Sequence, residues 1–62
     1  MNPADLIVRH KSGAVDWMAT DRAVARQVKA ENLSPVGAAL KHSWYMRKIK
    51  KIVWHQTPPL LR

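Results

Sequence analysis

Apolar and polar residues alternate at helical spacing through residues 22–30, with arginines and a lysine between valines and alanines. Thr20 or Asp21 suits the N-cap of such a helix, because a short polar side chain can accept a hydrogen bond from a backbone N–H of the first turn. Asn32 suits the left-handed residue that commonly closes a helix, with Leu33 as the apolar contact after it. We therefore predict one helix over residues 22–30.

The same pattern restarts at once after this turn. Ser34-Pro35 combines a good N-cap with proline at the first helical position. The helical spacing then continues to about His55, where Thr57-Pro58-Pro59 stops it. Two helices joined by a three-residue turn are expected to form a helical hairpin or a helix-turn-helix.

The first nineteen residues are ambiguous. Asn2-Pro3, Asp5 in the first turn and Gly13 after a polar stretch favour a short capped helix. The β-branched residues in 6–8 favour a strand instead, with 11–13 as a hairpin loop. We predict a mainly α fold, a small three-helix domain with a long C-terminal basic amphipathic helix. The alternative is an N-terminal β-hairpin or strand packed on two helices.

On a helix with about 100° per residue, residues 35–55 separate into two faces. One face has the spacing of a buried stripe and consists of His42, Tyr45, Met46, Ile49, Ile52 and Val53. The cations Arg47, Lys48, Lys50 and Lys51 spread over the opposite side, where Trp44 and Trp54 also lie. The earlier helix repeats this arrangement on a smaller scale, with Arg22, Arg26 and Lys29 on one face.

Length and composition narrow the class of protein. With 62 residues, the chain makes at most one domain, here residues 1–55, with an extended Pro-containing tail over 56–62. The absence of cysteine excludes disulfides and thiolate metal sites, and it favours a cytoplasmic location. The chain has four aromatic residues and no Phe, so its core is expected to be sparse. Small domains with sparse cores are often stabilised by oligomerisation, and a homodimer is therefore a possible state. We expect no cofactor and no metal.

Charge is divided unevenly along the chain, whose net charge is +7. The four acids all lie in the first half, at Asp5, Asp16, Asp21 and Glu31. We expect no acid to offset the cations that follow Glu31: Lys41, Arg47, Lys48, Lys50, Lys51 and Arg62. A cationic segment threaded with tryptophan indicates an anionic partner.

The charge pattern predicts a small basic nucleic-acid-binding accessory or regulatory protein, of a kind that phages and mobile elements encode, with DNA favoured over RNA. Phosphate contacts by about four to six of its cations would give a slope of log K against log salt of about −4 to −5. The predicted binding residues are Arg22, Arg26, Lys29, Lys41, Trp44, Arg47, Lys48, Lys50, Lys51 and Trp54. The start of the second helix, 35–40, lacks base-reading side chains, so we expect this small-residue surface to pack against another helix.

Other functions fit the residues less well. A protein-binding inhibitor or adaptor is the alternative, docking its basic, Trp-containing helix and its tail with Leu60-Leu61 on an acidic host protein. A Lys-rich helix with tryptophan can also lie in lipid headgroups, but no segment has the ~20 apolar residues of a membrane span, and we expect no membrane partner. The three histidines show no metal-binding spacing, and we expect no enzymatic activity.

Overall fold

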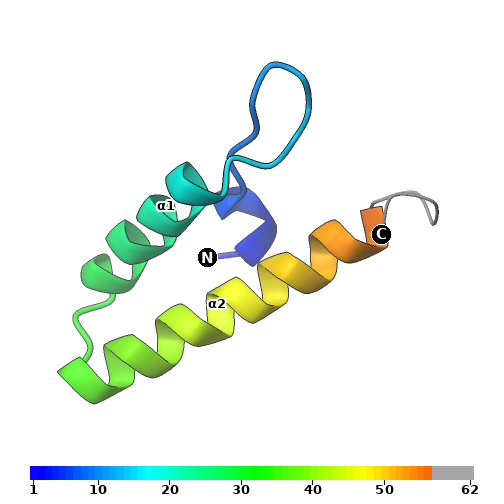
Figure 1. Cartoon of the computed structure of the whole chain (residues 1–62). Coiled ribbons are helices and arrows are strands. Elements are labelled where there is room, and N and C mark those ends of the chain that lie inside the picture. The colour runs from blue at the N-terminus through cyan, green and yellow to red at the C-terminus, as the bar shows by residue number, and fades with distance from the viewer. Residues whose placement is uncertain (57–62) are drawn as a thin grey trace.

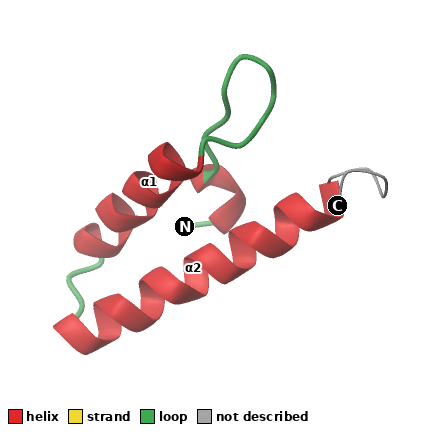
Figure 2. Ribbon diagram, viewed as in Figure 1, coloured by secondary structure: helices red, strands yellow, loops and turns green. Residues whose placement is uncertain are grey.

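The structure is a computed structural model that describes residues 1–56, and these are mainly helical (Figures 1 and 2). A single 3-10 turn, η1 (Pro3–Leu6), precedes two α-helices, α1 (Trp17–Ala30) and α2 (Pro35–Gln56). Figure 1 shows α1 and α2 running in opposite directions as a helical hairpin, with η1 in the angle between them. The prediction of a mainly α fold is confirmed; the third helix is a 3-10 turn.

The turn between the two helices is built as its sequence predicts. Asn32 adopts the left-handed conformation, with φ of 57°, and the side chain of Ser34 accepts a hydrogen bond from the backbone N–H of Gly37 at 3.2 Å. A Cβ at Gly37 would lie 3.2 Å from the Ser34 hydroxyl oxygen, so a glycine leaves room for this cap. α2 ends at Gln56, one residue beyond the predicted end.

The start of α1 differs from the prediction. Its N-cap is Asp16, whose carboxylate accepts a hydrogen bond from Ala19 N–H at 3.0 Å. Thr20, predicted as a cap, is completely buried four residues inside the helix. Its hydroxyl oxygen accepts from Val8 N–H at 2.9 Å and lies 3.3 Å from Val8 O. Thr20 is therefore used to fasten the preceding loop to α1.

Neither prediction for the N-terminal segment is right as a whole. Asn2 does cap a turn that begins at Pro3, but this turn ends at Leu6, and Ile7 is extended. Gly13 has φ of 93° and lies in the loop, where its N–H donates to His10 O at 2.9 Å. Within the described residues the loop contains only an isolated antiparallel bridge, between Arg9 and Val15, and no strand. Local capping shapes the first turn, and β-branched residues then favour extended backbone.

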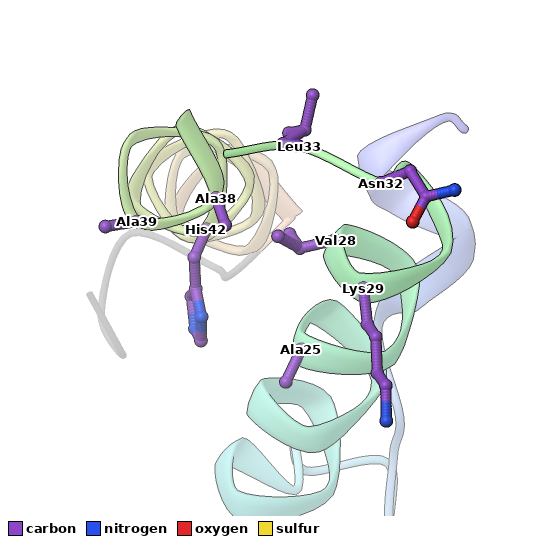
Figure 3. Close-up of a pocket in the computed structure, with 8 residues that line it drawn as sticks. All are labelled: Ala25, Val28, Lys29, Asn32, Leu33, Ala38, Ala39 and His42. Atoms are coloured by element: carbon purple, nitrogen blue, oxygen red, sulfur yellow. The ribbon is translucent and has the colours of Figure 1, made fainter. Parts of the chain in front are cut away.

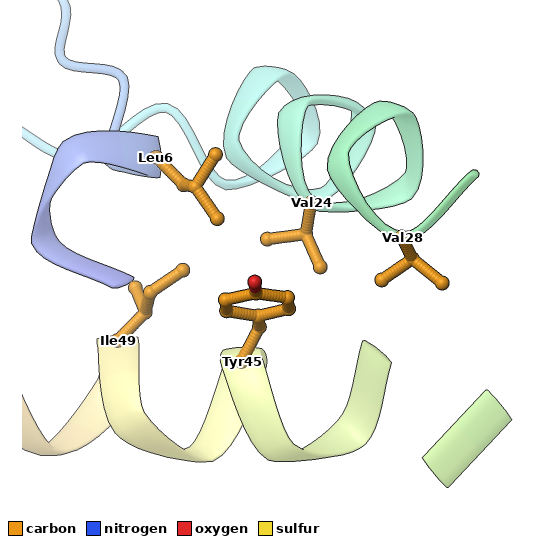
Figure 4. Packing of buried hydrophobic residues seen from close by; sticks show 5 residues of the cluster. All are labelled: Leu6, Val24, Val28, Tyr45 and Ile49. Atoms are coloured by element: carbon orange, nitrogen blue, oxygen red, sulfur yellow. The ribbon is translucent and has the colours of Figure 1, made fainter. Parts of the chain in front are cut away.

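The hydrophobic core is small and is shared by all three elements. Its buried apolar side chains meet between η1, α1 and α2 (Figure 4): Leu6, Val24, Val28, Tyr45 and Ile49. Burial of each contributes about 1.5–3 kcal/mol before the conformational entropy of the chain is subtracted. The predicted stripe of α2 is present, with Tyr45 and Ile49 buried and His42, Met46, Ile52 and Val53 half-buried.

The loop between η1 and α1 reaches the far end of α2. The guanidinium of Arg9 donates to Gly13 O at 2.7 Å and to the side chain of Gln56 at 2.8 Å. Gln56, predicted as the first residue of the tail, is thus the last residue of α2. The rest of that predicted tail, 57–62, lies outside the described residues.

Candidate functional site

The exposed side of α2 carries four cations within five positions. We call Arg47, Lys48, Lys50 and Lys51 the α2 patch, and all four side chains are exposed. Arg47 stands two residues from buried Tyr45 and two from buried Ile49, a rotation of about 200° from each. It therefore points away from the core, and the three lysines flank it on the same exposed side.

A surface hollow of about 370 Å³ lies within this patch. It is lined by Trp44, Arg47, Lys48 and Lys51, so that one aromatic ring and three cations share a single concave surface. All four residues are among those predicted to bind from the sequence. Such a surface can accept anionic groups at the cations and a flat apolar group against the indole.

Trp44 is more firmly anchored than the sequence suggests. It was expected on the exposed side, but it is half-buried and packs against the core. Its ring meets Tyr45 edge to face, with centroids 5.2 Å apart, while the Lys41 and Lys48 ammonium groups lie 4.6 Å and 5.7 Å from its centroid. Trp44 is adjacent to Tyr45 in sequence and therefore lies about 100° from it around the helix. At this angle its large indole still reaches the core.

Lys41 is not part of the uncompensated charge. Its ammonium lies 3.8 Å from the Glu31 carboxylate and 5.2 Å from the Tyr45 ring centroid. The expectation that no acid offsets the cations after Glu31 is therefore wrong for Lys41. Glu31 itself, the C-cap of α1, reaches across the turn to α2.

The same carboxylate accepts a hydrogen bond that the sequence analysis missed. The hydroxyl of buried Tyr45 donates to Glu31 at 2.5 Å, and the Gln27 amide donates to it at 3.0 Å. The bond from Tyr45, followed by those from Gln27 and the charge of Lys41, lowers the pKa of Glu31 below its ordinary value. The bond to Glu31, reinforced by burial, raises the pKa of Tyr45. Pairs this far apart in the chain leave no local sequence signal.

A second set of cations lies on α1. We call Arg22, Arg26 and Lys29 the α1 patch, and all three are exposed. Arg26 stands two residues from buried Val24 and two from buried Val28, so it points away from α2. The structure thus does not bring the α1 patch together with the α2 patch.

A groove of about 460 Å³ lies between the helices near their turn (Figure 3). Its floor is formed by small or apolar side chains, including Ala25, Val28 and Ala38, and Lys29 and His42 are among its other lining residues. Ala38 also packs against the core, so part of the predicted small-residue surface is used between α1 and α2. His42 also contacts α1, because its Nε2 lies 2.7 Å from Asp21 Oδ1. The sequence did not indicate this ion pair or hydrogen bond between the two helices.

Three of the four acids are engaged away from both patches. Asp16 caps α1 and lies 3.7 Å from His10, Asp21 meets His42, and Glu31 meets Tyr45 and Lys41. Within residues 1–56, Lys41 is the only lysine or arginine that forms an ion pair with a carboxylate. In the part of the chain that the structure describes, no cation of either patch is therefore paired with a carboxylate.

Large apolar residues are exposed along the same side of α2 as Arg47. Val36 and Leu40 are 71% and 67% exposed, and Trp54, a predicted binding residue, is 54% exposed. Leu40 and Trp54 each stand seven residues from Arg47, which returns to nearly the same side of the helix. The outer side of α2 is thus apolar toward its start, basic in its middle and aromatic near its end.

Among residues 1–56, no three His, Asp or Glu side chains lie close enough together to hold a metal ion. None of the described helices is both long and apolar enough to cross a membrane. Comparisons with protein-family models, with curated proteins and with solved structures found no match to this chain.

Proposed function

We propose that the protein is a small, non-enzymatic nucleic-acid-binding accessory factor whose α2 patch contacts the phosphates of duplex DNA. The observation that carries the proposal is the set of four exposed cations of the α2 patch, three of which line the Trp44 hollow, with no carboxylate of residues 1–56 paired to any of them. A polyanion releases condensed counterions when cations of this kind replace them, which makes association favourable at low salt. Phosphate contacts position a protein without reading sequence, so the expected binding is largely independent of base sequence.

The arrangement of the patch favours surface contacts with phosphates and not binding in a deep site. The lysines and Arg47 already lie in water, so only part of their hydration is lost when phosphates approach. Lys48 additionally lies over the Trp44 ring, which restricts this long side chain before binding. The indole at the hollow gives a sugar or an unstacked base an apolar surface to rest on.

The test is a titration of a 30-base-pair duplex of arbitrary sequence at several salt concentrations. The four cations of the α2 patch predict a slope of log K against log salt of about −3 to −4. Lys51→Gln should weaken binding roughly eightfold at about 0.1 M salt and make the slope shallower by about 0.9, because one phosphate contact is lost. Lys11→Gln, in the exposed loop, has the same net charge and should leave both quantities close to those of the unmodified protein.

Equal effects of Lys51→Gln and Lys11→Gln would show that only net charge matters and would overturn the proposed site. Absence of binding at 50 mM salt would overturn the function itself. Lys48→Glu with Lys51→Glu should abolish binding through the α2 patch, since the patch then carries acids beside Arg47 and Lys50.

A second candidate function is supported by the exposed apolar side chains of α2. Val36 and Leu40 lie on the same side of the helix as the basic patch, and an acidic partner protein with an apolar pocket would cover both. In this case the protein is an inhibitor or adaptor. Pull-down from nuclease-treated lysate separates the two candidates: an adaptor keeps its partner at moderate salt, and a nucleic-acid binder loses what it retained through DNA.

A further inference from the structure

The arginines at the centres of the two basic patches, Arg26 and Arg47, point in opposite directions across the hairpin. On α1, Arg26 stands two residues from each of the buried valines Val24 and Val28. On α2, Arg47 stands two residues from each of Tyr45 and Ile49. Since these four buried side chains face one another in the core (Figure 4), each arginine is turned about 200° from the contact between the helices.

We infer that one molecule of this protein holds two separate DNA duplexes, one against each helix, and so bridges them. The inference rests on the proposed function and extends it from a single contact surface to two. Duplex DNA is the occupant that the charge of both faces favours, because the charged members of each patch are all cations and none of them is paired with a carboxylate among the described residues.

The α1 patch is independent of the α2 patch in its construction. Arg22 and Arg26 lie one helical turn apart, and Lys29 continues the series nearly one turn further along. Figure 3 shows the Lys29 side chain extending away from the ribbon of α2. Arg22 and Lys29 are seven positions apart, or roughly 10 Å along the helix, which allows contacts with successive phosphates on one duplex.

The shape of the molecule prevents one straight duplex from contacting both patches. The described chain measures 40 × 21 × 16 Å along its principal axes, and the two patches lie on the outer sides of neighbouring helices. Two helices with their side chains separate those outer sides by roughly 20 Å. At about 0.1 M salt the Debye length is roughly 10 Å, so two duplexes held this far apart repel each other weakly while each directly contacts its own cations.

The experiment measures capture of one duplex by another. A biotinylated duplex is fixed to beads, a fluorescent duplex of a different length is added with the full-length protein, and fluorescence on the beads is recorded at about 0.1 M salt. The unmodified protein should retain the fluorescent duplex on the beads. Capture should rise with protein concentration and then fall, because excess protein binds each duplex separately.

Variants of equal net charge locate the two faces. Arg26→Gln on α1 and Arg47→Gln on α2 should each lower capture several-fold, whereas Lys11→Gln should leave it nearly unchanged. Arg22→Gln with Arg26→Gln should abolish capture but keep most of the protein bound to the beads, because the α2 patch is intact. Circular dichroism of each variant verifies that the helices are retained.

Three results would contradict the inference. If the protein binds duplex DNA but captures no second duplex, bridging is excluded and the proposed function stands. Unchanged capture by the double α1 variant would assign bridging to a dimer that binds through α2 alone. If neither bead binding nor capture occurs, the proposed function fails together with the inference.

Discussion

At the scale of single residues, the carboxylates decide where positive charge remains available. Glu31 illustrates this best, since it ends α1 and there meets the Tyr45 hydroxyl, Gln27 and Lys41. An acid at a helix C-terminus is unfavourable next to the negative end of the helix dipole. Donors from α2 offset this cost, and in doing so Glu31 joins the two helices and removes Lys41 from the basic surface.

The Glu31–Tyr45 hydrogen bond predicts a specific dependence of stability on pH. Because the pKa of Glu31 is lowered in the folded protein, its contribution to stability is complete above the ordinary carboxyl pKa of about 4.3. This contribution is lost as pH falls through the lowered value. On the alkaline side, the raised pKa of Tyr45 means that stability is lost as pH rises above about 10.

Tyr45→Phe tests this link. The variant removes the hydroxyl but keeps the ring in the core, so it should unfold at a lower temperature at pH 7 and lose less stability between pH 7 and pH 3. Thermal unfolding followed by circular dichroism measures both effects, and Glu31→Gln should show the same flattened profile. A pH dependence in Tyr45→Phe as steep as in the unmodified protein would contradict the assignment to this pair.

At the scale of the elements, the loop between η1 and α1 is held by a few polar contacts. Thr20 contacts both backbone groups of Val8 through its hydroxyl, and Arg9 ties the loop to the end of α2. Most of the loop is exposed. Its position therefore depends on these hydrogen bonds more than on burial of apolar surface.

Thr20→Val should release the loop from α1. Valine keeps the shape of threonine but offers Val8 N–H no acceptor, at a cost of about 1–2 kcal/mol. Amide hydrogen exchange read by NMR should show the Val8 amide exchanging much faster, with the amides of α2 little changed. Thr20→Ser retains the hydroxyl and should keep Val8 protected. Loss of protection in Thr20→Ser but not in Thr20→Val would mean that the methyl group, and not the hydroxyl, holds the loop.

At the scale of the whole molecule, a very small core supports a long helix. Among residues 1–56, five apolar side chains are buried, and a chain of this length hides only about 60% of its unfolded surface. Net stability is correspondingly low, and substitutions at the centre of the core act on the entire fold. Arg26 and Arg47, on the outer sides of the two helices, take no part in this core.

Ile49→Ala should therefore unfold much of the protein at 25 °C. Ile49 is completely buried, and removal of such a side chain costs about 2–5 kcal/mol, which is comparable to the total stability of a small domain. Ile52→Ala changes the same residue type at a half-buried position of the same helix and should cost clearly less. Urea denaturation followed by helical ellipticity compares the two, and equal losses would contradict the assignment of the core centre to Ile49.

The sequence predicts the helical hairpin well because its signals are local. Asn32 at the left-handed position and Ser34 before Pro35 each depend on backbone geometry within four residues. The N-terminal segment was less predictable because two local tendencies compete there, a capped turn at Asn2 and extended β-branched residues after Leu6. Thr20 has the residue type of an N-cap, but its contact is with Val8, twelve residues away, which no local pattern indicates.

The amino-acid sequence by itself determined the helix periods, the turn between them and the side of each helix on which its cations lie, since all of these follow from spacing along one segment. Only the tertiary structure decided how those sides are oriented relative to one another. Packing of Val24 and Val28 against Tyr45 turns the α1 and α2 patches away from each other. It also brings Glu31 to Lys41 and draws Trp44 toward the core. These relations join residues ten or more positions apart, and they arise from the burial of apolar surface between the helices, which no local pattern encodes.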